Sequence, residues 1–342
     1  MDPALAHRAR APRRWALCLA GTLAAVVPLA ASGPAGASGG SVALVAYSTP
    51  KPAYAALISA FAQTAAGQGV TFAQSYGPSG TQATAVANGL PADVVNFSLS
   101  PDMNKLVKAG LVSPSWAAGP NKGFVTNSIV SFVVRPGNPK HIKTWSDLVR
   151  SGVTVITPNP FSSGSAKWNL MAAYGAQLSQ GKSKVAATAY LGQLLKHTAA
   201  QPTSASTALQ AFLSGQGDVL LDYEDDALYA VHKGEPVQIV TPPQTILIQN
   251  PIAVSTKPVS PTAAKAFLAF LLSPKGQTIW GQQGYRPVLA PVAKQFHFPK
   301  PKTLFTIDSL GGWTKVNAVF FNPQTGVVAK LEQGLGVPTA SS

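Results

Sequence analysis

Short apolar runs alternate with longer amphipathic stretches along this chain from residue 42 onward. Runs of four to seven mostly apolar residues predict buried strands, at residues 42–47, 70–75, 93–98, 128–134, 153–157, 218–222 and 251–254. Apolar positions at helical spacing, often followed by glycine, predict helices, at residues 54–66, 81–88, 101–109, 144–150, 166–178, 184–196, 261–272 and 274–283. This alternation indicates an α/β fold with a largely parallel sheet.

The pattern is interrupted after the apolar strand 128–134, where Arg-Pro-Gly-Asn-Pro occupies residues 135–139. A second α/β unit follows, and the strand 251–254 returns to the first. We therefore expect two lobes joined by two extended crossings. Residues 38–127 with 250–342 form lobe 1, residues 128–249 form lobe 2, and the helices 261–272 and 274–283 pack on lobe 1.

The first 37 residues have the features of an export signal. Four arginines precede an apolar stretch at residues 15–31, and Ala35-Gly36-Ala37 offers a cleavage site. The stretch is too short for a membrane anchor, and the paired Arg13-Arg14 leaves a twin-arginine route open. The only cysteine, Cys18, lies inside this signal. We therefore expect a protein exported to the periplasm or cell envelope, cleaved near Ala37 and free of disulfides.

The composition favours a large folded core, because 46% of the 342 residues are hydrophobic and only 11% are charged. The net charge is +14, and +11 remains beyond residue 37. The basic residues are scattered and form no aromatic–basic stripe, so we expect no nucleic-acid partner. Long-range attraction of a small anion is a further use for the positive charge.

Two loops rich in serine and glycine each join a predicted strand to a predicted helix. They are Tyr-Gly-Pro-Ser-Gly-Thr at residues 76–81 and Ser-Ser-Gly-Ser at residues 162–165. Hydroxyls and free N–H groups at a helix start bind anions, because the helix dipole places partial positive charge there. One such loop also fits an ordinary turn or N-cap. Two loops at the carboxyl ends of strands in separate units predict a small oxyanion held from both sides.

Motifs that would indicate an enzyme are missing or incomplete. Ser48-Thr49-Pro50-Lys51 matches S-x-x-K, but its partner motifs do not occur, and Pro50 and Pro52 argue against a helix start there. The histidines beyond the predicted signal have no metal-ligand spacing and lie at His141, His197, His232 and His297. We therefore expect no enzymatic activity, no metal and no cofactor. A serine hydrolase and a purely structural envelope protein remain as alternatives.

Six motifs occur in a characteristic order: Ser79-Gly80-Thr81-Gln82-Ala83, Ala92-Asp93-Val94-Val95, residues 134–140, residues 155–160, residues 217–221 and Gly311-Gly312-Trp313. Together they resemble the sulfate/thiosulfate-binding proteins of bacterial ABC importers. The similarity extends from residue 42 to about residue 321, and the block 157–168 is its most specific part. The resemblance implies an α/β, two-lobed periplasmic binding protein fold of type II, with a dehydrated oxyanion in the cleft between the lobes. It also implies a membrane permease as partner, and we expect a monomer.

The resemblance further implies which groups donate hydrogen bonds to the oxyanion. They are the hydroxyls of Ser79 and Ser163, the main-chain N–H groups of Ser48, Gly164, Ser165 and Ser204, and the side chain of Tyr223. Several positions depart from the family pattern. Ser165 replaces a glycine, Tyr223 a tryptophan and Lys167 an arginine, and the segment around Ser204 lacks the arginine of the family.

A site lined only by donors selects a fully ionised oxyanion. The proton of hydrogen phosphate would face other donors, and the unpaired polar group would weaken binding. We therefore expect sulfate or thiosulfate. An acidic cluster leaves an alternative open, because Asp222 could accept the proton of phosphate or another protonated oxyanion. The simpler interpretation is N-capping and helix-dipole complementation by solvated carboxylates, namely Asp222, Glu224, Asp225 and Asp226.

Overall fold

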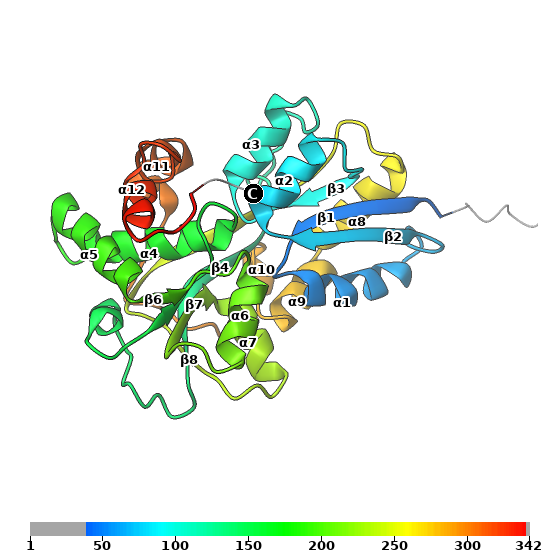
Figure 1. The fold of residues 1–342 in the computed structure, drawn as a ribbon. Coiled ribbons are helices and arrows are strands. Elements are labelled where there is room, and N and C mark those ends of the chain that lie inside the picture. Colours follow the sequence, from blue (N-terminus) through cyan, green and yellow to red (C-terminus); the bar gives the residue numbers. More distant parts are fainter. Residues whose placement is uncertain (1–38, 340–342) are drawn as a thin grey trace, which may run out of the picture. The chain divides into compact units, whose positions relative to one another are not determined.

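The computed structural model describes residues 39–339 and contains a single mixed sheet. Its strands are β1 Ser41–Tyr47, β2 Thr71–Gly77, β3 Val94–Asn96, β4 Phe124–Val134, β5 Val155–Ile156, β6 Thr198–Ala200, β7 Val219–Tyr223, β8 Gln238–Val240, β9 Gln244–Val254, β10 Arg286–Pro287 and β11 Thr303–Phe305. The main order is β2-β1-β3-β9-β4-β7-β5-β6 (Figure 1). The predicted signal peptide and Cys18 lie outside the described residues.

Two parallel strand sections are connected by the two longest strands. Strands β1, β2 and β3 are parallel, as are β5, β6 and β7. Between them, β4 and β9 run antiparallel to each other; β9 also pairs with β3, and β4 with β7. The predicted α/β class is confirmed, but β9 begins at Gln244 rather than at residue 251.

The helices match most of the predicted positions. They are α1 Lys51–Ala62, α2 Ser79–Ala87, α3 Ser100–Lys108, η1 Trp145–Val149, α4 Gly164–Ser179, α5 Lys184–Lys196, α6 Ala205–Leu213, α7 Glu224–His232, α8 Pro261–Leu272, α9 Pro274–Gln282, α10 Ala290–Ala293, η2 Ile307–Leu310, α11 Gly312–Phe320 and α12 Val327–Gly334. Helix α1 begins at Lys51, with Pro52 in its first turn. The expectation that Pro50 and Pro52 oppose a helix start was wrong. A proline in the first turn lacks only an N–H group that would have no partner within the helix.

Helices cover both faces of the β1–β3 section. Helices α1, α8 and α9 pack on one face, where Tyr54, Phe267 and Trp280 are fully buried. Helices α2 and α3 cover the other face (Figure 1). The predicted packing of helices 261–272 and 274–283 against the first unit is therefore confirmed. No helix within residues 39–339 has both the length and the apolar character needed to cross a membrane.

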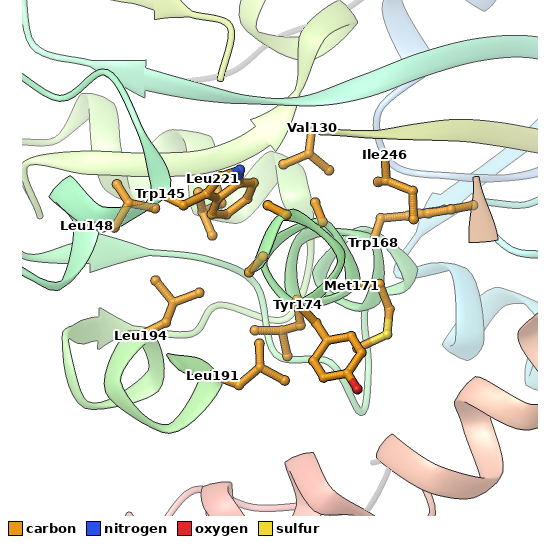
Figure 2. Packing of buried hydrophobic residues seen from close by; sticks show 14 of the residues in the cluster. Val130, Trp145, Leu148, Trp168, Met171, Tyr174, Leu191, Leu194, Leu221 and Ile246 are labelled. Carbon is orange, nitrogen blue, oxygen red and sulfur yellow. The ribbon is translucent and has the colours of Figure 1, made fainter. Parts of the chain in front are cut away.

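Helix α4 is the centre of the largest apolar core. Its residues Trp168, Met171 and Tyr174 pack among α5 and the strands of the second section (Figure 2). Trp313 and Phe320 of α11 join the same cluster. Helix α11 thus packs with residues predicted for lobe 2, although residues 250–342 were predicted for lobe 1. The reason is that β11 pairs with the start of β9, which directs the chain toward α4.

Candidate functional site

The two Ser-Gly loops meet at the carboxyl ends of the two parallel strand sections. A Cβ atom at Gly80 would lie 3.4 Å from the carbonyl oxygen of Ser162. A Cβ atom at Gly164 would lie 2.6 Å from Ser98 Oγ, closer than such atoms can approach. Glycine is therefore required at residue 164, and the two loops lie close together.

Ser98 connects the predicted site residues to one another. Its N–H donates to Ser79 Oγ at 3.0 Å, and its carbonyl accepts from Trp168 Nε1 at 2.9 Å. Its hydroxyl lies 2.7 Å from the hydroxyl of Tyr223. Ser98 was not among the predicted site residues. Its position at the carboxyl end of the predicted strand 93–98 could have indicated a role in the site, because ligands bind at such strand ends.

Serines at helix starts play two different roles in this fold. Ser183, Ser204 and Ser273 each accept a hydrogen bond from an N–H of the following helix, which is the ordinary capping role. Helices α2 and α4 begin without a side-chain cap, although Ser79 and Ser163 stand at their first turns. The hydroxyls of these two serines are therefore directed elsewhere, and the positive ends of both helices lack a side-chain partner.

The start of α4 places hydroxyls and N–H groups together. Ser163 Oγ lies 2.8 Å from Ser165 Oγ, and both residues are buried. The N–H of Ser163 donates to the carbonyl of Asn159 at 2.9 Å. The hydroxyl of Ser163 and the first-turn N–H groups of Gly164 and Ser165 are the groups suited to an anion.

Ser79 is paired with a carboxyl group that the sequence analysis did not select. Its hydroxyl donates to Asp102 Oδ2 at 2.6 Å while it accepts from the N–H of Ser98. Burial raises the pKa of Asp102, against the opposing effects of Lys167, the Ser79 hydroxyl and Lys105. A hydroxyl has one hydrogen. Ser79 can therefore donate to an anion only when its hydrogen is released from Asp102, and a proton on Asp102 favours that release.

Two lysines lie beside this pair, around a cavity of about 270 Å³. The cavity is lined by Gly80, Thr81, Thr84, Asp102, Lys105, Phe161, Lys167, Phe321, Pro323 and Thr339. Lys105 Nζ donates to Thr84 Oγ1 at 2.8 Å, and Lys167 Nζ lies 5.2 Å from the centre of the Phe321 ring. Burial lowers the pKa of Lys167, and the nearby Asp102 opposes this effect.

The main-chain N–H groups of Ser48 and Ser204, both predicted to donate to the oxyanion, lie in different surroundings. Ser48 is partly exposed and follows Tyr47, whose ring centre lies 6.4 Å from that of Tyr223. The N–H of Ser204 donates to Thr207 Oγ1 at 3.0 Å, and its hydroxyl accepts from the N–H of Thr207. The backbone donor predicted at Ser204 is thus occupied in this conformation, and the capping interpretation fits it better.

Asp222 does not lie beside the hydroxyl of Tyr223. Successive side chains of β7 alternate between the faces of the sheet. Tyr223 belongs to the core around α4. Leu220 lies two residues before Asp222, on the same face of the strand, and it packs against α6 and α7. Asp222 therefore points to the face opposite Tyr223. Asp222 Oδ1 accepts from the N–H of Tyr223 at 2.8 Å. The geometry gives no support to Asp222 as the acceptor for a protonated ligand.

The acidic cluster is buried rather than solvated. Asp222, Glu224 and Asp225 are each 1% exposed. Glu224 forms two hydrogen bonds with Arg286, at 2.6 and 2.9 Å, whereas neither carboxylate oxygen of Asp225 has a hydrogen-bond partner. Within residues 39–339, no three His, Cys, Asp or Glu side chains are arranged to hold a metal. The prediction of solvated carboxylates was wrong. Burial favours the protonated, neutral forms of the three aspartates Asp222, Asp225 and Asp226.

Comparison with known proteins identifies a family. Residues 42–286 match the model of the family described as bacterial extracellular solute-binding protein. A sulfate-binding protein of Synechococcus elongatus is 40% identical, over 91% of this chain and 94% of its own length. A thiosulfate-binding protein of Pseudomonas aeruginosa is 34% identical, over 75% of this chain and 80% of its own length.

Solved structures agree with this relationship. The sulfate-binding protein SubI from Mycobacterium tuberculosis is 46% identical, with a TM-score of 0.80, and the match covers 82% of this chain and 99% of SubI. The periplasmic thiamin-binding protein, at 21% identity and a TM-score of 0.59, shares the fold alone. The predicted periplasmic binding protein fold is therefore confirmed.

Proposed function

The chain belongs to the sulfate- and thiosulfate-binding proteins among the bacterial extracellular solute-binding proteins, and we propose that it captures sulfate or thiosulfate for an ABC importer. Its relatives are binding proteins rather than enzymes, so the hydrolase alternative is set aside. The main support for the proposal is that the N-termini of α2 and α4 lie close together, that neither has a side-chain cap, and that each has a buried serine.

We expect the proposed donors to face one position at this meeting point. They are the hydroxyls of Ser79, Ser163 and Tyr223 and the N–H groups of Ser48, Gly164 and Ser165. An unpaired buried dianion would be strongly disfavoured, and donors aligned with helix dipoles replace its hydration shell without a paired cation. Fixed donors also reduce the cost of ordering flexible side chains on binding.

The proposed capture involves movement of two lobes about β4 and β9. We assign residues 39–127 and 250–306 to one lobe, and residues 128–249 and 307–339 to the other. Closure presents both lobes together to a membrane permease, which is the expected partner. The mature protein begins after Ala37 and acts as an exported monomer.

Calorimetric titration of the exported protein with sulfate, thiosulfate, phosphate and molybdate tests the proposal. Sulfate or thiosulfate should bind most tightly. The Ser163→Ala substitution should weaken that binding by about 10- to 100-fold, the effect of one hydrogen bond to a charged group. Ser179→Ala is the matched control, because Ser179 ends the same helix and its hydroxyl bonds only to the Gly175 carbonyl. Equal affinities in both variants, or no binding of either anion, would refute the proposed site.

A further inference from the structure

We propose that Ser98 and Tyr223 form a hydroxyl pair that supplies one hydrogen-bond acceptor to this oxyanion site. The pair lets the site bind hydrogen phosphate and other singly protonated oxyanions in addition to fully ionised ones. This inference rests on the proposed function and concerns the selectivity of the same site.

The two hydroxyls come from opposite strand sections and meet inside the protein. Ser98 Oγ and the Tyr223 hydroxyl oxygen are 2.7 Å apart, and the two residues are 1% and 0% exposed. The backbone N–H and carbonyl of Ser98 already bond to Ser79 and Trp168. The hydroxyl is therefore the part of Ser98 left to interact with Tyr223 and with a ligand.

The position of the pair coincides with the proposed donors. Ser98 Oγ lies against Gly164 at the start of α4, where a Cβ atom would be 2.6 Å away. The N–H of Ser98 holds Ser79 Oγ, the proposed donor from α2. Donors from both helix starts thus border Ser98, so an anion held by them also meets the hydroxyl pair.

The pair has two hydrogens, and one of them is used between its own oxygens. Either oxygen can be the donor of that bond. Burial raises the pKa of Tyr223, so its hydroxyl keeps its hydrogen. Toward sulfate, the pair presents the remaining hydrogen and acts as a donor. Toward hydrogen phosphate, Ser98 Oγ accepts the ligand proton and donates to the Tyr223 oxygen, whose hydrogen then bonds another ligand oxygen.

An indole at residue 223 could not act in this way. Its N–H only donates, so an indole could not accept from the Ser98 hydroxyl while Ser98 Oγ accepts the ligand proton, and one hydrogen of this arrangement would remain unpaired. Sites that leave a buried polar group unpaired disfavour the wrong ligand by about 10⁴- to 10⁵-fold. The replacement of the indole by a phenol beside a serine removes the reason for that rejection.

Titration with sulfate and with hydrogen phosphate at pH 8 tests the inference. The wild-type protein should bind hydrogen phosphate within about a thousandfold of its sulfate affinity, clearly closer than a donor-only site allows. Ser98→Ala and Tyr223→Phe should each raise the ratio of sulfate affinity to phosphate affinity by about tenfold, the effect of one neutral hydrogen bond. Sulfate binding should fall less, because one hydroxyl donor remains.

Tyr190→Phe is the matched control, because this buried tyrosine donates to the Trp145 carbonyl and should leave the ratio unchanged. If Ser98→Ala does not fold, Tyr223→Phe decides the question. Sulfate binding with no measurable phosphate binding in the wild type would overturn the inference, as would an unchanged ratio in both variants. Absence of sulfate and thiosulfate binding in the wild type would overturn the proposed function itself.

Discussion

Ser79, Ser163 and Ser204 all stand near helix starts, yet their hydrogen bonds separate them. Ser204 caps its helix in both directions, through its hydroxyl and its N–H. Ser163 pairs with Ser165 and Ser79 with Asp102, and neither caps its helix. The same residue type therefore caps the helix at one position and bonds to other side chains at two others, according to which neighbours the fold supplies.

The Asp102–Ser79 pair predicts a pH dependence of anion affinity. Sulfate keeps its charge across mildly acidic and neutral pH, whereas protonation of Asp102 removes a negative charge and releases the hydrogen of Ser79. Sulfate affinity should therefore rise as the pH falls from 8 to 5. In Asp102→Asn the affinity should be at least as high as in the wild type at pH 8 and nearly independent of pH, as measured by calorimetry.

The control for this prediction is Asp308→Asn, which changes an exposed carboxylate. It should keep the wild-type pH profile. Parallel profiles for the wild type and Asp102→Asn would show that Asp102 does not control the Ser79 hydrogen.

At the scale of elements, helix α7 begins with three acids inside the protein. Glu224 is paired with Arg286, whereas Asp225 faces the hydroxyl groups of Tyr47, Ser128 and Tyr285 and the acidic side chain of the neighbouring Asp226. Burial raises the pKa of Asp225 to about 8 and that of Asp226 to about 7. A cavity of about 10 Å³ beside them, also bordered by Thr49, has room for about one water molecule.

These raised pKa values predict that stability falls as the pH rises. Between pH 4 and pH 8 the unfolded chain has lost the proton of Asp225 while the folded protein keeps it, so the unfolded state binds fewer protons. The free energy of unfolding should decrease by about 1.4 kcal/mol per pH unit for this group and level off above pH 8. Asp225→Asn should remove that part of the slope, as measured by urea unfolding at pH 5, 6.5 and 8.

Asp226 keeps its own contribution in the Asp225→Asn variant, so the slope should decrease without disappearing. Glu235→Gln, at an exposed position, serves as the control and should leave the slope unchanged. A wild-type protein that becomes more stable from pH 5 to pH 8 would contradict the assignment of buried protons to this cluster.

For the whole molecule, contacts between the two strand sections gather at the proposed site. Trp168 and Tyr223 both bond to Ser98, and Gly80 lies close to Ser162. A ligand between these groups stabilises the folded state that contains all of them. Sulfate at a hundred times its dissociation constant should add about 2.7 kcal/mol to the free energy of unfolding, and the gain should grow with the logarithm of concentration.

Urea unfolding at several sulfate concentrations checks this expectation. Ser163→Ala should need a proportionally higher sulfate concentration for the same gain, whereas Ser179→Ala should match the wild type. No gain with any of the four oxyanions would favour a structural protein instead.

Local sequence was enough to predict the α/β class, most helices and the two Ser-Gly loops. Apolar spacing and glycine stops act over a few residues, so α4, α5, α8 and α9 could be located without a structure. The two Ser-Gly loops could be found because a strand, a serine-glycine turn and a helix start are neighbours along the chain.

Tertiary structure decided the parts that depend on distant residues. Ser98 and Tyr223 are far apart in sequence, and the contact between their hydroxyls could not be predicted before the positions of β3 and β7 in the fold were known. The packing of α11 against α4 and the burial of Asp225 likewise arise from contacts between distant segments. Local propensity carries no information on such contacts, because the folded protein determines which polar groups are left without water and which neighbours they meet.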